Sequence, residues 1–136
     1  MNTDNNNVVN IAAIVKKRFD LLITAADQTY SQTFELDKTI AFVKGILVCA
    51  NKDDLLYYRG SQKIELNRQE IFPEGYESKL LQSGTNCPVN QRYFNTGNMP
   101  IGNGQLKVTY KDITDSRAAF EPYRISIYVD CELKEY

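Results

Sequence analysis

Paired acidic residues are the first candidates for chemistry in this sequence, which contains no histidine. Two carboxyl groups a few ångströms apart can hydrolyse a glycosidic bond. The available groups are Asp53–Asp54, Glu74 with Glu77, and Asp112 with Asp115. All lie where turn residues are frequent, and turns favour acids without any catalytic role. We expect solvated surface carboxylates, no catalytic residues and no enzyme activity, with a carboxylate-dependent hydrolase as the third hypothesis.

The lack of histidine also removes Ser-His-Asp and Cys-His catalysis and histidine-ligated metals. Asn51–Asp54 lacks the ligand order of a calcium loop, and the glycine-rich segment Gly97–Gly104 lacks the Lys-Ser/Thr that follows a phosphate-binding loop. Cys49, Cys87 and Cys131 are odd in number and widely spaced, which argues against a disulfide framework or a zinc site. We expect no metal and no cofactor, with Cys49 and Cys131 as buried free thiols.

The size and charge of the chain narrow its partners. The 136 residues carry 16 basic and 17 acidic side chains, a net charge of -1, which suits one domain and gives no electrostatic reason to bind a nucleic acid. The polar segment MNTDNNN and the basic residues after the first apolar run do not form a secretory signal. No apolar run approaches the roughly 20 residues that span a membrane, so we expect a soluble protein made in the cytoplasm.

Two segments near the end alternate apolar and polar residues, as half-buried antiparallel strands do. In Gln105–Asp112 the inward side chains begin with Leu106, and in Tyr123–Leu133 they begin with Ile125. The nearly continuous apolar segment Thr39–Ala50 predicts a central strand covered on both faces. Gly45 within it predicts a bulge or a close backbone approach.

The rest of the chain predicts further short strands separated by turns. The expected elements are strands at Leu21–Ala25, Thr29–Leu36 and Gln91–Asn95, a hairpin of Leu55–Arg59 with Gln62–Asn67, and loops at Glu70–Tyr76, Ser83–Asn90 and Thr96–Gly104. Eight or nine strands without βαβ alternation predict an all-β fold, an antiparallel sandwich of jelly-roll or Greek-key type spanning residues 20–136. Residues 1–19 are expected to form an N-terminal arm with a short helix at Val8–Arg18, although its β-branched residues would also suit a strand.

Tyrosine supplies rigid contact area at protein interfaces, and the chain has nine tyrosines. Most occupy inward strand positions, but Tyr58, Tyr93 and Tyr128 are expected to point outward. With the apolar face of the arm, the predicted interface residues are Val8, Ile11, Val15, Tyr58, Tyr93 and Tyr128.

Three features resemble the small β-sandwich structural proteins of tailed-bacteriophage virions, particularly crAss-like phages that infect Bacteroidetes. They are the Asn-rich amino-terminal segment, the string Glu70–Glu77 and the closing strand Tyr123–Leu133. The resemblance implies a homo-oligomeric subunit that decorates or stiffens a capsid or forms a connector, located in the virion among other virion proteins. The alternative hypothesis is a carbohydrate- or cell-surface-binding module that recognises a host glycan through loops 83–90 and 96–104.

Overall fold

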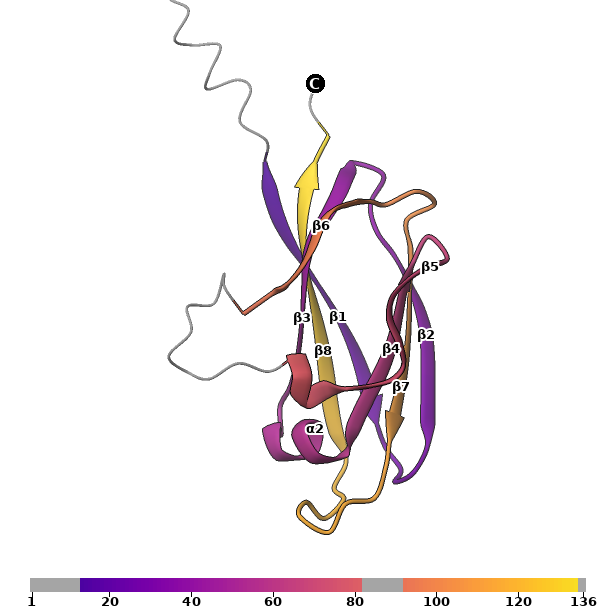
Figure 1. Ribbon diagram of the computed structural model, residues 1–136, viewed down its shortest axis with the longest axis vertical. Helices are drawn as coiled ribbons and strands as arrows, with labels where there is room; N and C mark the ends of the chain where they lie inside the picture. The colour runs from indigo at the N-terminus through magenta and orange to yellow at the C-terminus, as the bar shows by residue number, and fades with distance from the viewer. Residues whose placement is uncertain (1–12, 82–91, 135–136) are drawn as a thin grey trace, which may run out of the picture.

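The computed structural model describes residues 13–81 and 92–134, and it shows two four-stranded sheets packed face to face (Figure 1). The first, sheet A, has the strand order β1-β8-β3-β6, and the second, sheet B, has the order β2-β7-β4-β5. A helix, α2 (Asp53–Arg59), and a short 3-10 helix, η1 (Ser78–Leu81), lie between strands. The strands are β1 (Ile14–Ile23), β2 (Thr29–Glu35), β3 (Ile40–Ala50), β4 (Gly60–Leu66), β5 (Gln69–Glu77), β6 (Phe94–Pro100), β7 (Gln105–Asp112) and β8 (Tyr123–Leu133).

The strands pair in order from the two ends of the sequence toward its middle. β1 pairs with β8, β2 with β7, β3 with β6 and β4 with β5, and every pair is antiparallel. β8 also pairs with β3, and β7 with β4, which completes the two sheets. A long hairpin rolled up in this way is an eight-stranded jelly roll. The predicted antiparallel sandwich is therefore confirmed.

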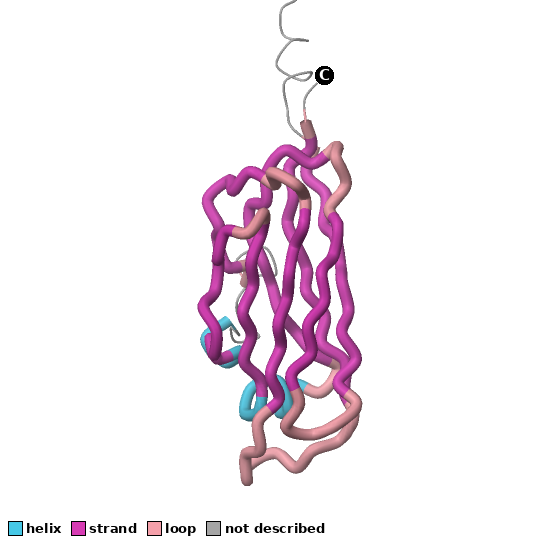
Figure 2. The backbone as a smooth tube through the Cα atoms, turned by 90° about the vertical axis from the view of Figure 1, so that its right-hand side faces the viewer, coloured by secondary structure: helices cyan, strands magenta, loops and turns pink. Residues whose placement is uncertain are grey.

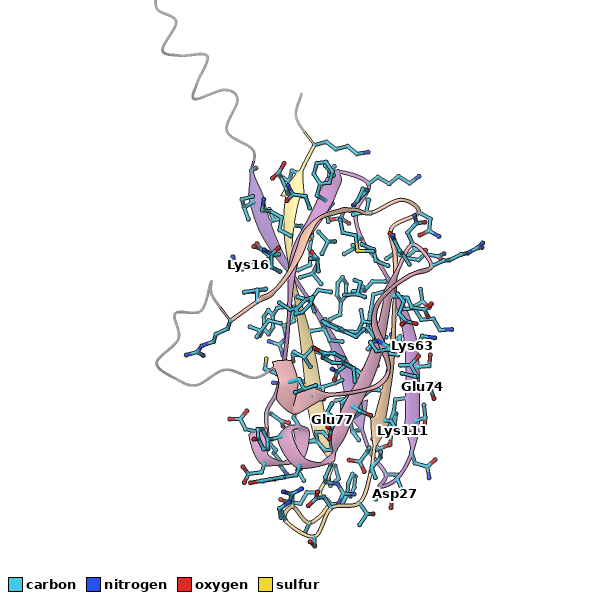
Figure 3. The ribbon with its side chains drawn as sticks, viewed as in Figure 1. Lys16, Asp27, Lys63, Glu74, Glu77 and Lys111 are labelled. Carbon is cyan, nitrogen blue, oxygen red and sulfur yellow. The ribbon has the colours of Figure 1, made fainter. Side chains whose placement is uncertain are left out.

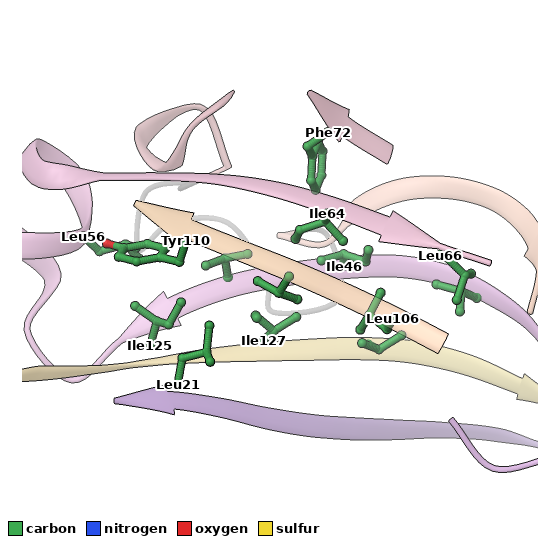
Figure 4. Packing of buried hydrophobic residues seen from close by; sticks show 14 of the residues in the cluster. Leu21, Ile46, Leu56, Ile64, Leu66, Phe72, Leu106, Tyr110, Ile125 and Ile127 are labelled. Atoms are coloured by element: carbon green, nitrogen blue, oxygen red, sulfur yellow. The ribbon is translucent and has the colours of Figure 1, made fainter. Parts of the chain in front are cut away.

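The strands run along the long axis of the molecule (Figure 2), and the hydrophobic core lies between the two sheets (Figure 4). Ile46 and Ile127 of sheet A and Ile64 and Leu106 of sheet B are fully buried in it. Their alternation with outward residues fixes the register of each strand, because a slip by one residue would move the whole apolar set to the outside. Each such side chain contributes about 1.5–3 kcal/mol by leaving water.

A buried polar network connects the two sheets at the end where α2 lies. The Arg59 guanidinium donates to both carboxylate oxygens of Asp112, from Nε at 3.1 Å and from Nη2 at 2.9 Å. The Tyr123 hydroxyl donates to the same carboxylate at 2.7 Å and lies 2.8 Å from the Tyr110 hydroxyl. The prediction that Asp112 is a solvated surface acid is thus wrong: it is 1% exposed, since the ends of β7, β8 and α2 close over it.

The predicted N-terminal helix is wrong over its described part. Residues from Ile14 onward form β1, and this strand pairs with β8 over ten positions from Ile14 opposite Glu132 to Ile23 opposite Tyr123. Val15 and Phe19 are four residues apart, which places them on one face of a helix and equally on one face of a strand. The bonds to β8 decide in favour of the strand, and residues 8–12 lie outside the described part.

Three other predictions, made for segments between Leu55 and Gly104, fail. The expected hairpin at Gly60-Ser61 is absent, because Asp53–Arg59 is helical and β4 instead pairs with β5 across the turn Asn67-Arg68. The expected loop Glu70–Tyr76 belongs to β5, an edge strand that tolerates Pro73 because no strand of the described residues pairs with its outer side. The chain from Thr96 to Pro100 is likewise strand rather than loop, whereas segment 83–90 falls outside the described residues.

Candidate functional site: the outer face of sheet A

The candidate site is the surface of sheet A that points away from the core, called here the sheet A face. Val43, Ile46 and Val48 of β3 are core residues, so alternation sends Leu47 and Cys49 to the opposite side. The register continues this surface onto β8 and β1, because Leu47 lies opposite Tyr128 and Tyr128 opposite Arg18. The sheet A face consists of Lys16, Arg18, Asp20, Leu22, Lys44, Leu47, Cys49, Tyr93, Arg124, Ser126, Tyr128, Asp130 and Glu132.

Two tyrosine rings lie on this face beneath cationic side chains of β1. The Arg18 guanidinium carbon is 5.7 Å from the centre of the Tyr128 ring, and the Lys16 ammonium is 5.4 Å from that of Tyr93. Such cation–π contacts contribute about 0.5–1 kcal/mol at exposed sites. Burial, together with the nearby Asp130 carboxylate, raises the pKa of the Tyr93 hydroxyl.

Gly45 makes the position of Tyr93 possible. The strand pairing of β3 shifts register between Val43 and Gly45, so the predicted bulge is confirmed. A methyl group added at Gly45 would lie 3.0 Å from Cβ of Tyr93 and 3.1 Å from the backbone oxygen of Phe94. The missing side chain therefore lets β6 and the Tyr93 ring approach β3 closely.

Most charges on the sheet A face are neutralised by neighbours on the same face. Lys16 pairs with Asp130 at 3.4 Å, Arg18 with Asp20 at 2.9 Å and Lys44 with Glu132 at 3.3 Å. The Arg18 hydrogen bond holds the pKa of Asp20 below its usual value. A surface whose charges are already paired loses less solvation free energy when a partner covers it than one with isolated charges.

Apolar side chains lie among these ion pairs. Leu22, on the outward side of the edge strand β1, is 66% exposed, and Ile14 at the start of that strand is 48% exposed. Leu47 and Cys49 are half-buried at the centre of the face, so Cys49 is more accessible than predicted, while Cys131 is fully buried as expected. Burial raises the pKa of the Cys131 thiol to about 11, and it also raises that of Cys49.

The structure brings together only part of the predicted interface. Tyr93 and Tyr128 share the sheet A face, as the cation–π contacts show. Val15 points inward and packs against the core. Tyr58 lies elsewhere, on α2, with the Arg117 guanidinium 4.6 Å from its ring, and Val8 and Ile11 lie outside the described residues.

The other candidate acidic residues lie on three separate segments. Asp53 and Asp54 occupy the first turn of α2, Glu74 and Glu77 lie on β5, and Asp115 accepts hydrogen bonds from Arg117. Within residues 13–81 and 92–134, no three His, Cys, Asp or Glu side chains are close enough to hold a metal ion.

Sequence reasoning missed Lys16, Arg18 and Leu47 as members of the site. The alternation of Lys16, Arg18 and Asp20 would have placed them on one face if the segment had been taken as a strand.

Comparison of the chain with family models, with curated proteins and with solved structures gave no match. No helix in the described ranges is sufficiently long and apolar to cross a membrane.

Proposed function

We propose that this chain is a non-enzymatic structural subunit of a phage virion, an auxiliary or connector protein that binds neighbouring subunits through the sheet A face. The observation that carries the proposal is the composition of this face, in which Tyr93, Tyr128 and Leu47 lie among charges that pair with one another. Protein interfaces have this composition, with aromatic and aliphatic side chains at the centre and polar groups at the rim.

The size of the face supports the proposal. The strands are about 4.8 Å apart, and three of the four are 10 or 11 residues long while β6 has 7, so the face covers at most roughly 19 by 33 Å. This flat area of about 600 Å² is of the same order as the roughly 800 Å² of accessible surface per partner in a standard protein interface. The jelly roll itself occurs in viral capsid proteins and also in lectins, so the fold by analogy is compatible with the proposal but does not distinguish these functions.

A pair of matched substitutions tests the role of the face. Leu47→Lys places a charge at its centre, and Thr109→Lys places the same charge on the outer side of sheet B, where Thr109 pairs with Lys63. We expect the full-length chain to form oligomers in light scattering coupled to gel filtration, Leu47→Lys to reduce the oligomer mass, and Thr109→Lys to leave it unchanged. Equal masses for all three proteins would count against the proposal.

The location in a virion has a separate test. Mass spectrometry of purified phage particles is expected to detect this chain at a fixed stoichiometry, and its absence from particles would overturn the virion assignment.

The contribution of the predicted arm to oligomer formation is measured by deleting residues 2–12. A deletion to residue 18 would remove half of β1, and its effect on assembly would then report unfolding instead of a lost contact.

A further inference from the structure

The outer surface of sheet B, called here the sheet B face, carries polar side chains arranged in rows across the strands. Core residues Leu106, Val108 and Tyr110 of β7 alternate with outward Lys107, Thr109 and Lys111. The strand register places these three opposite Glu65, Lys63 and Ser61 of β4 and opposite Thr33, Ser31 and Thr29 of β2. The centre of this face therefore has hydroxyl groups along β2, and along β7 and β4 ammonium groups that lie next to hydroxyl groups.

Two hollows lie next to each other along β4 and β7 on this face. The larger has a volume of about 330 Å³ and is lined by Thr33, Glu65, Arg68, Gln105 and Lys107. The smaller, of about 80 Å³, includes Ser61, Lys63, Thr109 and Lys111 in its lining. It lies beside the irregular stretch of β5, where Gly75 adopts a φ of 78° and the pairing with β4 shifts register.

The cations along the hollows are not neutralised as those of the sheet A face are. Arg68, Lys107 and Lys111 make no ion pair with any residue in the described ranges, and Lys63 reaches Glu65 only at 3.9 Å. The lining of the two hollows contains more basic than acidic residues. The acidic ones are Glu65 and Glu74, and the basic ones are Lys63, Arg68, Lys107 and Lys111. Figure 3 shows Lys63, Glu74 and Lys111 on the side of the sandwich away from Lys16.

A buried hydroxyl group beside the smaller hollow lacks a partner. Ser61 is 5% exposed, and its Oγ makes no hydrogen bond. Buried polar groups are nearly always hydrogen-bonded, so this hydroxyl has a free donor and free acceptor positions at a site that two ammonium groups flank. An oxygen-rich group that entered the hollow would accept hydrogen bonds from the Ser61 hydroxyl and from the ammonium groups of Lys63 and Lys111.

We propose that the two hollows bind an acidic saccharide, with a sugar ring in the larger hollow beside Lys107 and a carboxylate or sulfate group in the smaller hollow near Lys111 and Ser61. The larger volume is at the lower end of the range of about 300–1,000 Å³ for ligand pockets, which suits one small ring. The described lining has no aromatic side chain on which a nucleic-acid base would stack. Hydroxyls, amides and carboxylates there suit the hydroxyl groups of a sugar, and the excess of cations selects for an acidic one.

The experiment is calorimetric titration of the full chain with three tetrasaccharides. Oligogalacturonate carries carboxylates, a chondroitin sulfate fragment carries sulfates as well, and maltotetraose is neutral. We expect at least one acidic saccharide to bind at least tenfold more tightly than maltotetraose, and the better of the two identifies the preferred anionic group. Equal binding of the neutral saccharide, or no binding of either acidic one, overturns the proposal.

Substitutions then locate the site. Lys107→Gln with Lys111→Gln is expected to lower the affinity at least tenfold, whereas the matched pair Lys16→Gln with Lys44→Gln on the sheet A face leaves it unchanged. An equal loss in both double variants would indicate non-specific charge attraction and overturn the site. Because the sheet A face is not involved, a failure here is independent of the proposed assembly function.

Ser61→Ala separates binding from folding. The free protein is expected to be as stable as the wild type or more stable, since the substitution removes an unpaired buried hydroxyl. The affinity for the acidic saccharide is expected to fall about fivefold, because the ligand loses a hydrogen bond. Unchanged affinity with an intact fold would remove Ser61 from the site and contradict the proposed placement of the anionic group.

Discussion

The two outer faces of this jelly roll differ in what their charged side chains bind. On the sheet A face Lys16, Arg18 and Lys44 each have an acidic partner. On the sheet B face Lys107 and Lys111 have none in the part of the chain that the structure describes. Paired charges around apolar side chains suit contact with a protein, while unpaired cations among hydroxyl groups suit a polar anionic ligand. The same fold thus presents two chemically distinct surfaces.

This difference arises from the alternation of side chains along each strand. Each β-strand sends every second residue to the core, which leaves the outward residues free to differ without altering the packing. Along β8 the outward set includes Arg124, Tyr128 and Asp130, and along β7 it includes Lys107 and Thr109. The inward sets of both strands are apolar except at the end near α2, where the buried Tyr110, Asp112 and Tyr123 are hydrogen-bonded in one network.

The largest effect on stability is expected from substitutions in the buried network of Arg59 and Asp112, which connects the two sheets. Arg59→Ala leaves the Asp112 carboxylate buried without its main cation, and removing one partner of a buried pair costs about 3–5 kcal/mol. Because Asp112 belongs to sheet B and Tyr123 to sheet A, both sheets should unfold together at lower urea. The free energy of unfolding is measured by urea titration.

The exposed ion pair Lys52 to Glu121, at 3.3 Å, provides the matched control. Lys52→Ala is expected to change the free energy of unfolding by less than about 1 kcal/mol. If Arg59→Ala had an effect as small as the control, the network would not connect the sheets, and the faces could be treated as independent.

The same network is expected to make the protein less stable in acid, and this loss should be smaller than that caused by Arg59→Ala. Burial disfavours the charged form of Asp112, but hydrogen bonds from Arg59, Tyr123 and the Asp27 backbone outweigh it and hold the pKa below its usual 3.8. A group whose pKa is lower in the folded state stabilises the fold above its unfolded pKa, and this contribution is lost as the pH falls through the folded value. Urea titrations between pH 6 and pH 2 should therefore show a decline that begins near pH 4.

Asp112→Asn separates this contribution from those of the exposed acids. The asparagine cannot ionise, so the variant is expected to be less stable than the wild type at pH 6 and to lose less of its stability between pH 6 and pH 2. Parallel declines in the two proteins would assign the acid sensitivity to other carboxylates.

Gly45→Ala is expected to alter the sheet A face alone. The added methyl group would lie 3.0 Å from Tyr93 Cβ and 3.1 Å from the Phe94 oxygen, so β6 must move, at a cost of about 1–2 kcal/mol. Oligomer formation should weaken with the displacement of Tyr93, while binding of an acidic saccharide on sheet B stays at the wild-type level. Loss of both activities at an unchanged stability would mean that the faces are coupled.

The sequence predicted those elements whose pattern is local and unbroken. β7 and β8 were expected at Gln105–Asp112 and Tyr123–Leu133, and they have these bounds. α2 was missed because the short apolar run from Leu55 suits a strand equally well, although Asp53, Asp54 and Arg59 stand at the ends that favour their charges in a helix. Pairing of residues distant in sequence, such as Arg59 with Asp112, leaves no local pattern and could not be read from the chain.

The candidate site was predicted in the same partial way. Tyr93 and Tyr128 were recognised because alternation within each strand shows which rings face outward. Their place on one surface depends on β6, β3 and β8 being neighbours, and sequence alternation contains no information on strand order. The hollows of the sheet B face depend on the pairing of β4 with β7. These two strands are separated by about 40 residues along the chain, so their pairing could not be predicted from sequence alternation either.

The smallest expected effect lies in the turn that joins β4 to β5, and it affects the sheet B face only. Asn67 and Arg68 have φ values of 51° and 63°, the left-handed region that favours Asn-Gly in a two-residue hairpin turn. Arg68→Gly relieves this strain and should raise the free energy of unfolding by about 0.5–1 kcal/mol. Because Arg68 also lines the larger hollow, the more stable variant should bind the acidic saccharide more weakly, and Arg68→Asn should weaken binding similarly with a smaller gain in stability. Retained affinity in both variants would place the saccharide away from this end of β4, whereas a gain in stability with a loss of binding would show that Arg68 is kept in a strained conformation for its charge.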